Sequence, residues 1–410
     1  MKEAILAQLR LLMRPHPGWY GLAAAVMLTT LGVMAISTVD GVLNVPTGVA
    51  LAQGRRWLPI ALIAMSAAAL PRPRLIGRAA WPLLTFALLL LVYVVIPGAP
   101  RVPRINGTTA WIDLGVMNFQ PSELGKVAFV LAMAWYLRYR ESYRTLTGLL
   151  VPFAIMLIPV ALILKEPDLG QAMVFAPTLF VMLVAAGARL RHIGSLLGIG
   201  LLAVALNVAV IYLDPPHDRR GGAWDYAHVL APHQERRVAA MIWPDRYAKR
   251  DAFQPLVAQR LIGAGGLIGV GKERARTLVR FNRLPEPHND MIFAVIVNRW
   301  GLLGGGAVLG LYLVLLSSFF LVAARSKDPF ARLVCVGFGG MIFAQAMINI
   351  GVAVGLVPTT GITLPLVSYG GSSLVATFTM IGLMLNFACR RPVLVSRPSF
   401  EFDHADPAYS

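Results

Sequence analysis

The chain has 410 residues, of which 57% are hydrophobic and only 14% are charged, and its formal net charge is +17. Soluble domains carry about 25% charged residues, so this composition excludes an ordinary soluble domain and indicates a membrane protein. No stripe of basic and aromatic residues accompanies the positive charge, which argues against nucleic-acid binding.

Apolar segments long enough to cross a bilayer recur along the chain. We predict about ten transmembrane helices, at residues 20–36, 57–70, 79–96, 119–137, 146–164, 171–186, 193–213, 290–323, 333–356 and 367–389. The second is short, and the eighth is long enough to be tilted or bent. The helices must pack together to hide several polar clusters, so we expect one all-α membrane domain over residues 1–395. The polar tail 396–410 is expected to be disordered.

Basic residues occur in every second connection, for example in 72–78, 138–144 and 325–332. The positive-inside rule therefore places both termini in the cytoplasm and the large loop 214–289, between the seventh and eighth helices, outside. The two cysteines, Cys335 and Cys389, lie at cytoplasmic helix ends and imply neither a disulfide nor a metal site. No cleavable signal peptide is evident.

Three charged residues stand where the outer loop re-enters the membrane: Glu286, His288 and Asp290, directly before an apolar run. Charged groups at this boundary are costly to desolvate, which favours a functional role. The alternative is an ordinary helix start, in which Asn289 or Asp290 caps the helix.

A second polar cluster lies in the fourth predicted helix, where Glu123 and Lys126 are three residues apart and share one helix face. The two side chains either neutralise each other inside the bundle, or Lys126 holds a lipid phosphate while Glu123 positions it. A third cluster is the tight outer connection 165–171. Its Asp168 is either a helix cap or part of a polar pocket that opens outward.

Two glycine-rich segments complete the set. Residues 263–271, followed by Lys272, resemble a phosphate cradle in composition but match neither the P-loop nor the dinucleotide pattern, so a flexible re-entrant loop is the alternative. The preceding 252–262 are expected to lie along the membrane surface as an amphipathic helix. Residues 361–373, with Ser368 and Ser372, break a helix at membrane depth. They either line a cavity or allow close helix packing.

Six motifs in order resemble the SEDS family of cell-wall polymerases, the rod-shape and cell-division membrane proteins that act beside class B penicillin-binding proteins. They are Ile-Asn-Gly at 105–107 with Trp-Ile-Asp-Leu-Gly at 111–115, Gln-Pro-Ser-Glu at 120–123 with Lys126, Pro-Asp-Leu-Gly at 167–170, the glycines of 263–271, Leu-Pro-Glu-Pro-His-Asn-Asp at 284–290, and 364–373. The resemblance extends from about residue 105 to residue 386, which is most of the chain.

The resemblance implies a glycosyltransferase of type C-like fold in the bacterial cytoplasmic membrane. It implies an inverting enzyme that polymerises lipid II, the undecaprenyl-pyrophosphate-linked disaccharide-pentapeptide, for cell elongation or division. Its implied partners are a class B penicillin-binding protein and membrane lipid. The sequence does not distinguish elongation from division.

In the family, the Asp of the fifth motif is the essential carboxylate, and that position is Asp290. A carboxylate can act as general base towards the acceptor hydroxyl. Cations would stabilise the departing pyrophosphate. Lys126 is the first candidate cation, with Lys272 and the loop arginines next. A divalent ion such as Mg²⁺ is a further candidate, although the sequence shows no ligand set. The other expected substrate-binding residues are Glu123, Glu286, His288, Asp168, Ser368 and Ser372.

The chain departs from the family pattern at four positions. Ala110 replaces an Arg, Asn298 and Arg299 replace acidic residues, and Asn289 replaces a Thr. These changes put phosphate contacts, pairing of the eighth helix and partner coupling in doubt, but leave the expected base in place.

Two other functions fit polar groups within a membrane protein: a lipid II flippase or transporter, and a non-catalytic scaffold that activates a partner synthase. The polar groups lie on one side of the membrane and the chain shows no convincing internal repeat, which argues against transport.

Overall fold

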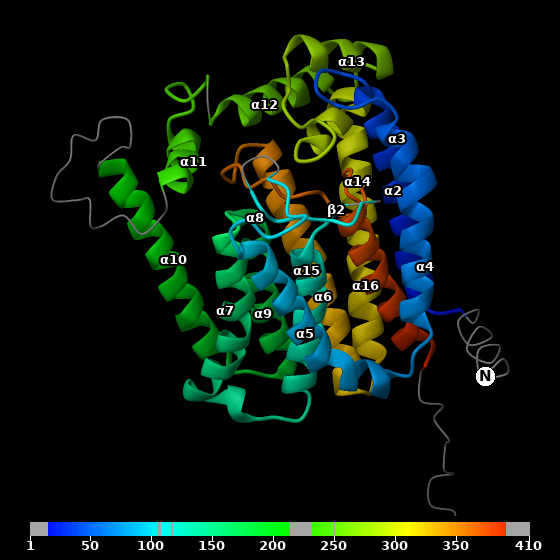
Figure 1. Cartoon of the computed structure of the whole chain (residues 1–410), viewed down its shortest axis with the longest axis vertical. Helices are drawn as coiled ribbons and strands as arrows, with labels where there is room; N and C mark the ends of the chain where they lie inside the picture. Colours follow the sequence, from blue (N-terminus) through cyan, green and yellow to red (C-terminus); the bar gives the residue numbers. More distant parts are fainter. Residues whose placement is uncertain (1–14, 105–107, 116–117, 214–231, 250, 391–410) are drawn as a thin grey trace, which may run out of the picture.

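The computed structural model describes residues 15–104, 108–115, 118–213, 232–249 and 251–390. Long helices run side by side, and short helices and loops gather at one end, which is the upper end in Figure 1. The helices are α2 (Gly18–Val39), α3 (Val49–Ala52), α4 (Leu58–Ala69), α5 (Pro73–Val95), α6 (Pro121–Leu137), α7 (Leu150–Lys165), α8 (Leu169–Met173), α9 (Phe175–Ala186), α10 (Leu190–Leu213), α11 (Pro232–Ile242), α12 (Phe253–Gly265), α13 (Lys272–Phe281), α14 (Ile292–Arg325), α15 (Pro329–Ala353) and α16 (Gly371–Cys389).

Short elements complete the fold. A π-helical turn, Gln53–Trp57, joins α3 to α4, and two 3₁₀ turns, Ser142–Arg144 and Thr147–Leu149, precede α7. Two short antiparallel strands that were not predicted, β1 (Ile112–Asp113) and β2 (Asn118–Phe119), pair before α6. The motif at 105–107 and the tail 396–410, for which the sequence made predictions, lie outside the described residues.

Eight helices in the described part of the chain are long and apolar enough to cross a membrane. The chain is therefore an all-α multi-pass membrane protein, as predicted. Each predicted span overlaps a helix, but most ends differ by a few residues, and α5 begins six residues before the predicted start at 79. The second helix continues backwards through the π-turn to Val49. The last begins at Gly371, since residues 364–370 form a loop. Residues 290–291 lie outside α14.

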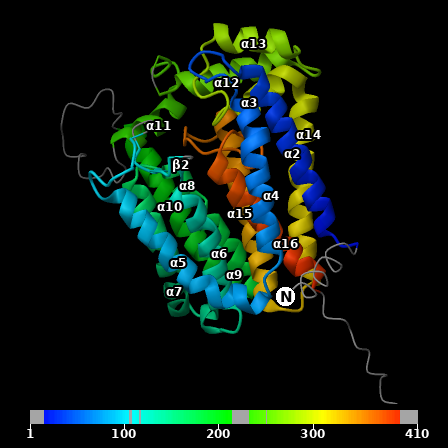
Figure 2. The ribbon, with the colours of Figure 1, turned by 45° about the vertical axis from the view of Figure 1, so that its right-hand side comes forward.

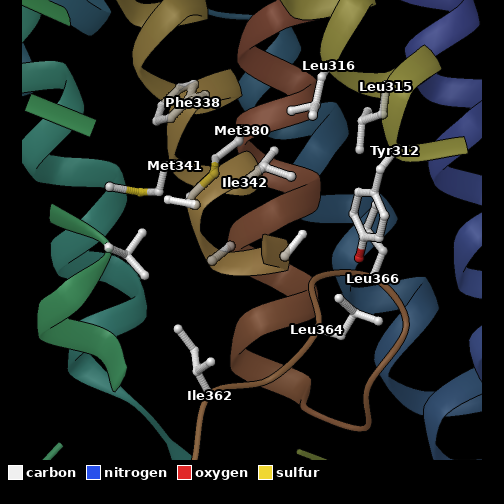
Figure 3. Packing of buried hydrophobic residues seen from close by; sticks show 14 of the residues in the cluster. Tyr312, Leu315, Leu316, Phe338, Met341, Ile342, Ile362, Leu364, Leu366 and Met380 are labelled. Atoms are coloured by element: carbon white, nitrogen blue, oxygen red, sulfur yellow. The ribbon is translucent and has the colours of Figure 1, made fainter. Parts of the chain in front are cut away.

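Burial divides the helices into a centre and a periphery. In the most apolar stretch of each helix, 83% of α16 and 78% of α15 is buried, compared with 6% of α10. Figure 1 shows α10 set apart from the bundle, and Figure 2 shows the bundle from a second side. Figure 3 shows the centre, where the Tyr312 side chain of α14 points to the loop that precedes α16, and its hydroxyl donates a hydrogen bond to the Pro365 carbonyl.

The eighth helix is bent, as its length suggested, at Gly301, whose φ of 70° and ψ of −168° break α14. Residues 266–271, which we call the glycine strap, satisfy the backbone groups that the break frees. The amides of Val270 and Gly271 donate to the carbonyls of residues 298–299, at 3.0 and 3.1 Å. The carbonyls of residues 266–267 accept from the amides of residues 302–303, at 2.9 and 3.2 Å. Such pairing allows irregular backbone at membrane depth.

Candidate functional site

The backbone of residues 288–290 is held by three hydrogen bonds just before α14. Its successive carbonyls accept from the Tyr369 amide at 2.9 Å, the Ser368 hydroxyl at 2.6 Å and the Asn349 side-chain amide at 2.9 Å. Asn349 also donates to the Ile362 carbonyl at 2.7 Å. Two segments that are far from Asp290 in the sequence, α15 and the loop 361–370, therefore fix its position.

The Asp290 carboxyl is half-buried, and no side chain in the described part of the chain forms a hydrogen bond with it. A Cβ atom placed on Gly361 would lie 3.8 Å from Asp290 Oδ2, so this glycine borders the carboxyl closely. Burial raises the pKa of Asp290 to about 7, with further increases from the negative charges of Glu286 and Asp168, while Arg237 opposes them. A carboxyl with this pKa exchanges its proton readily near neutral pH.

Asp168 caps α8, as one reading of the sequence predicted, and it also contacts a polar side chain of α6's N-terminal end. Its Oδ1 accepts from the Gln171 amide at 3.0 Å and its Oδ2 from the Gln120 side chain at 3.3 Å. Burial raises its pKa to about 6, against the lowering effects of the Gln171 amide and of Lys126. We call Asp168 and Asp290 the carboxylate pair.

The predicted pairing of Glu123 with Lys126 is confirmed, with the ammonium 3.0 Å from Glu123 Oε1 and side-chain exposures of only 3% and 1%. Lys126 also donates to Gln345 at 2.7 Å, and Gln171 donates to the same Glu123 oxygen at 3.0 Å. We call these four residues the buried network. Two of the three ammonium protons of Lys126 are engaged, and the side chain reaches no surface, so direct contact with a lipid phosphate is not open to it in this conformation.

Glu286 and His288 lie beside Asp290 on the same turn. Glu286 Oε2 accepts from Asn289 at 2.9 Å and is 3.9 Å from His288 Nε2. Burial lowers the pKa of His288, although Glu286 opposes this effect. At neutral pH the imidazole is therefore mainly uncharged, and it lies 5.8 Å, centroid to centroid, from the Tyr369 ring.

The two predicted serines bind backbone. Ser368 accepts from the Leu364 amide at 2.8 Å, in addition to its bond to the residue 289 carbonyl. Ser372, in the first turn of α16, accepts from the Gln120 amide at 3.2 Å and donates to the Asn118 carbonyl at 3.3 Å. Both hydroxyls thus hold loops around the carboxylate pair.

Lys272 is exposed at the start of α13. The glycines before it do not form a phosphate cradle, since the amides of Val270 and Gly271 are bonded to α14. The expected surface helix at 252–262 is α12, but it packs against α14, with the Gly265 Cα next to the residue 297 carbonyl. Close backbone packing explains the glycines here.

Arg237 is the residue that sequence reasoning did not single out. It lies on α11, where Nη1 donates to the Thr359 carbonyl at 3.1 Å, and its charge acts on both members of the carboxylate pair. It also lines a cavity of about 200 Å³ with residues of α12, among them Gln259, and of the segment 355–359. One basic residue among many in a long loop gave no signal of this position.

Two of the residues that depart from the family pattern, Asn298 and Arg299, form hydrogen bonds to other helices. The Asn298 amide donates to the Leu261 carbonyl in α12 at 2.7 Å, and Arg299 donates to the Thr38 hydroxyl at 2.9 Å near the end of α2. Ala110 is buried. Thus α14 is pinned to α12 and α2 without acidic residues.

A family model for a cell cycle protein, FtsW/RodA/SpoVE, matches residues 19–391. The chain is 35% identical over 308 residues to stage V sporulation protein E of Bacillus subtilis, covering 74% of this chain and 77% of the relative. It is 31% identical over 381 residues to a protein described as "Probable peptidoglycan glycosyltransferase FtsW" of Mycobacterium tuberculosis, covering 92% and 68%.

Two solved structures are similar along nearly their whole length. One, described as "Structural coordination of polymerization and crosslinking by a peptidoglycan synthase complex", contains a chain with a TM-score of 0.73 and 32% identity that covers 92% of this chain and 98% of its own. The other, the rod shape determining protein RodA of Thermus thermophilus, has a TM-score of 0.63 and 28% identity and covers 91% and 97%. The chain therefore belongs to the FtsW/RodA/SpoVE family, the SEDS proteins, as its motifs predicted.

Proposed function

We propose that the chain is a peptidoglycan glycosyltransferase that polymerises lipid II at the outer face of the bacterial cytoplasmic membrane, with Asp290 as general base. The observation that carries the proposal is the Asp290 carboxyl, which is held by its backbone, has a pKa of about 7 and lies within the field of Arg237. The name of the Mycobacterium tuberculosis relative supports the same activity.

In the proposed reaction, Asp290 takes the proton of an acceptor sugar hydroxyl as its oxygen attacks the anomeric carbon of the donor. The bond between that carbon and the pyrophosphate oxygen breaks, and the configuration inverts. Negative charge develops on the leaving pyrophosphate, and a fixed cation beside it stabilises the transition state. Arg237 is the best-placed cation, because it lies at a cavity and acts on the carboxylate pair.

The other predicted residues take supporting roles in this proposal. Lys126, in the buried network, attracts the Asp168 carboxylate and lowers its pKa, whereas Glu123 opposes this effect and pairs with Lys126. Glu286 raises the pKa of Asp290, and His288 lies beside Glu286. Ser368 and Ser372 hold the surrounding loops, and Lys272 remains an exposed cation of the outer surface. The described residues include no group of three or more His, Cys, Asp or Glu placed to hold a metal, so we derive no step through a divalent ion.

We further propose that the chain crosses the membrane ten times and has a type C-like glycosyltransferase fold. Two helices would cross the membrane in addition to the eight long ones. The continuous helix from Val49 to Ala69 is long enough once its π-turn is included, and α6, although it has only 17 residues, is almost wholly buried within the bundle. Both termini would lie in the cytoplasm. A class B penicillin-binding protein is the proposed partner, supported by the similar synthase complex.

A lipid II flippase is the second candidate, since polar groups inside a bundle also serve transport. The elements next to these polar residues, β2 and α8, lie towards the end that carries α11–α13 (Figure 1), whereas alternating access requires a site near the midplane.

The deciding experiment supplies the purified protein and its penicillin-binding partner with lipid II and measures glycan polymer. Asp290→Ala should abolish polymer while leaving thermal unfolding close to that of the parent. Full polymerisation by Asp290→Ala would refute the assignment. Movement of lipid II across vesicles without polymer would favour the flippase. If the partner alone forms polymer, and if the parent chain and Asp290→Ala stimulate it equally, the scaffold is favoured.

A further inference from the structure

The π-turn between α3 and α4 brings a buried glutamine to the loop that holds Asp290. Gln53 is the first residue of this turn and is 1% exposed. Its side-chain amide donates to the Ser368 carbonyl at 3.2 Å, across 315 positions of sequence. Burying a glutamine side chain without a hydrogen-bond partner costs free energy, so this hydrogen bond stabilises the buried position of Gln53.

Ser368 connects Gln53 to the candidate base. Its hydroxyl donates to the residue 289 carbonyl at 2.6 Å, and the next amide, that of Tyr369, donates to the residue 288 carbonyl at 2.9 Å. Gln53 therefore binds the loop that contains Ser368, and this loop in turn binds the backbone of residues 288–289, directly before Asp290. A second contact lies four residues later, where the Trp57 ring packs on Gly371.

One helix face makes both contacts. Gln53, Trp57 and Ala61 are four residues apart and all buried, and both the π-turn and α4 contact α16. Residues four apart share a face of a helix, so Gln53 and Trp57 lie on the same side.

We propose that Gln53, placed by the π-turn, is a positioning residue that fixes Asp290 through Ser368. The inference rests on the proposed role of Asp290 as base. Gln53 touches neither the carboxyl of Asp290 nor the cavity lined by Arg237, so it acts only through the loop.

Two variants of the full chain test this inference. Gln53→Met removes the donor at nearly the same length. Gly54→Ala is the matched control, since a Cβ at this neighbouring position meets no atom within 4 Å. The measurements are kcat and KM for polymerisation, and hydrogen exchange of the backbone amides of residues 288–292.

We expect Gln53→Met to lower kcat about tenfold, with KM within about twofold, because a misplaced base slows the chemical step more than binding. It should also speed amide exchange at residues 288–292 but not in the centre of α15. Gly54→Ala should match the parent in both measurements.

Parental kcat and exchange in Gln53→Met would overturn the inference, as would a loss in Gly54→Ala equal to that in Gln53→Met. Faster exchange throughout α15 would show that Gln53 holds the whole fold and would also overturn it. If the parent makes no polymer but Gln53→Met still loosens residues 288–292 alone, the positioning role stands and the proposed function fails.

Discussion

The buried network and the carboxylate pair differ in how their charges are compensated. In the buried network, Lys126 and Glu123 are almost fully enclosed and hydrogen-bonded to each other and to two glutamines. In the carboxylate pair, Asp290 is half-buried and surrounded by more negative than positive charge. The compensated pair supports the fold, because each buried charge has an opposite charge and hydrogen bonds within reach. An uncompensated carboxyl has a raised pKa and can exchange protons.

The largest expected effect is therefore on folding, from the buried network. Lys126→Met leaves Glu123 buried without its cation, which should lower the free energy of unfolding by about 3–5 kcal/mol. Thermal or denaturant unfolding in detergent measures the loss. The double variant Glu123→Gln with Lys126→Met should recover much of it, and a single variant as stable as the parent would show that this network is not structural.

The next effect concerns the cation beside the carboxylate pair. Arg237→Ala should lower kcat by about 100-fold, the usual cost of removing one group that stabilises transition-state charge. Arg237→Lys should retain part of the rate. Arg260→Ala, an exposed arginine on α12, is the matched control and should leave kcat unchanged. Equal losses of kcat in Arg237→Ala and Arg260→Ala would show that the positive charge of the surface in general, and not Arg237 in particular, supports the rate.

A smaller effect is the pH dependence of the reaction. With the Asp290 pKa at about 7, kcat should rise about tenfold between pH 6 and pH 8, as the base form becomes dominant. A flat profile would contradict the role of Asp290 as the titrating base.

Stability should move in the opposite direction. The folded-state pKa of Asp290 is raised above 3.8, its ordinary value, so the folded state binds the proton more tightly. This contribution is fully present below about pH 4 and is lost as the pH rises through 7. Asp290→Asn should remove this part of the pH dependence, which unfolding curves at several pH values can measure.

The smallest effect is expected far from both regions. Leu201 on α10 is 69% exposed within the protein, so Leu201→Ala should change the free energy of unfolding by less than about 0.5 kcal/mol. Phe378→Ala, at a fully buried position of α16, should cost about 3–5 kcal/mol. A large effect of Leu201→Ala would mean that α10 packs against something other than lipid.

The sequence predicted what depends on local pattern. Apolar runs located the helices, the spacing of Glu123 and Lys126 predicted their pairing, and the motif that ends at Asp290 located the candidate base. It did not reveal the contacts of Gln53, Asn349 or Arg237, because each joins segments that are far apart in the chain. Nor did it reveal that the glycines of the strap serve a broken helix, because their partners lie some 30 residues later.

The glycine strap has a consequence for exchanging parts between relatives. Its hydrogen bonds make residues 263–303 one structural unit, although the boundary between outer loop and membrane helix falls within it. A chimera that joins one relative's loop to another's helix near Asp290 would separate the strap from the bend at Gly301. A junction beyond residue 303 keeps both halves from one parent, and is the boundary at which such hybrids should fold.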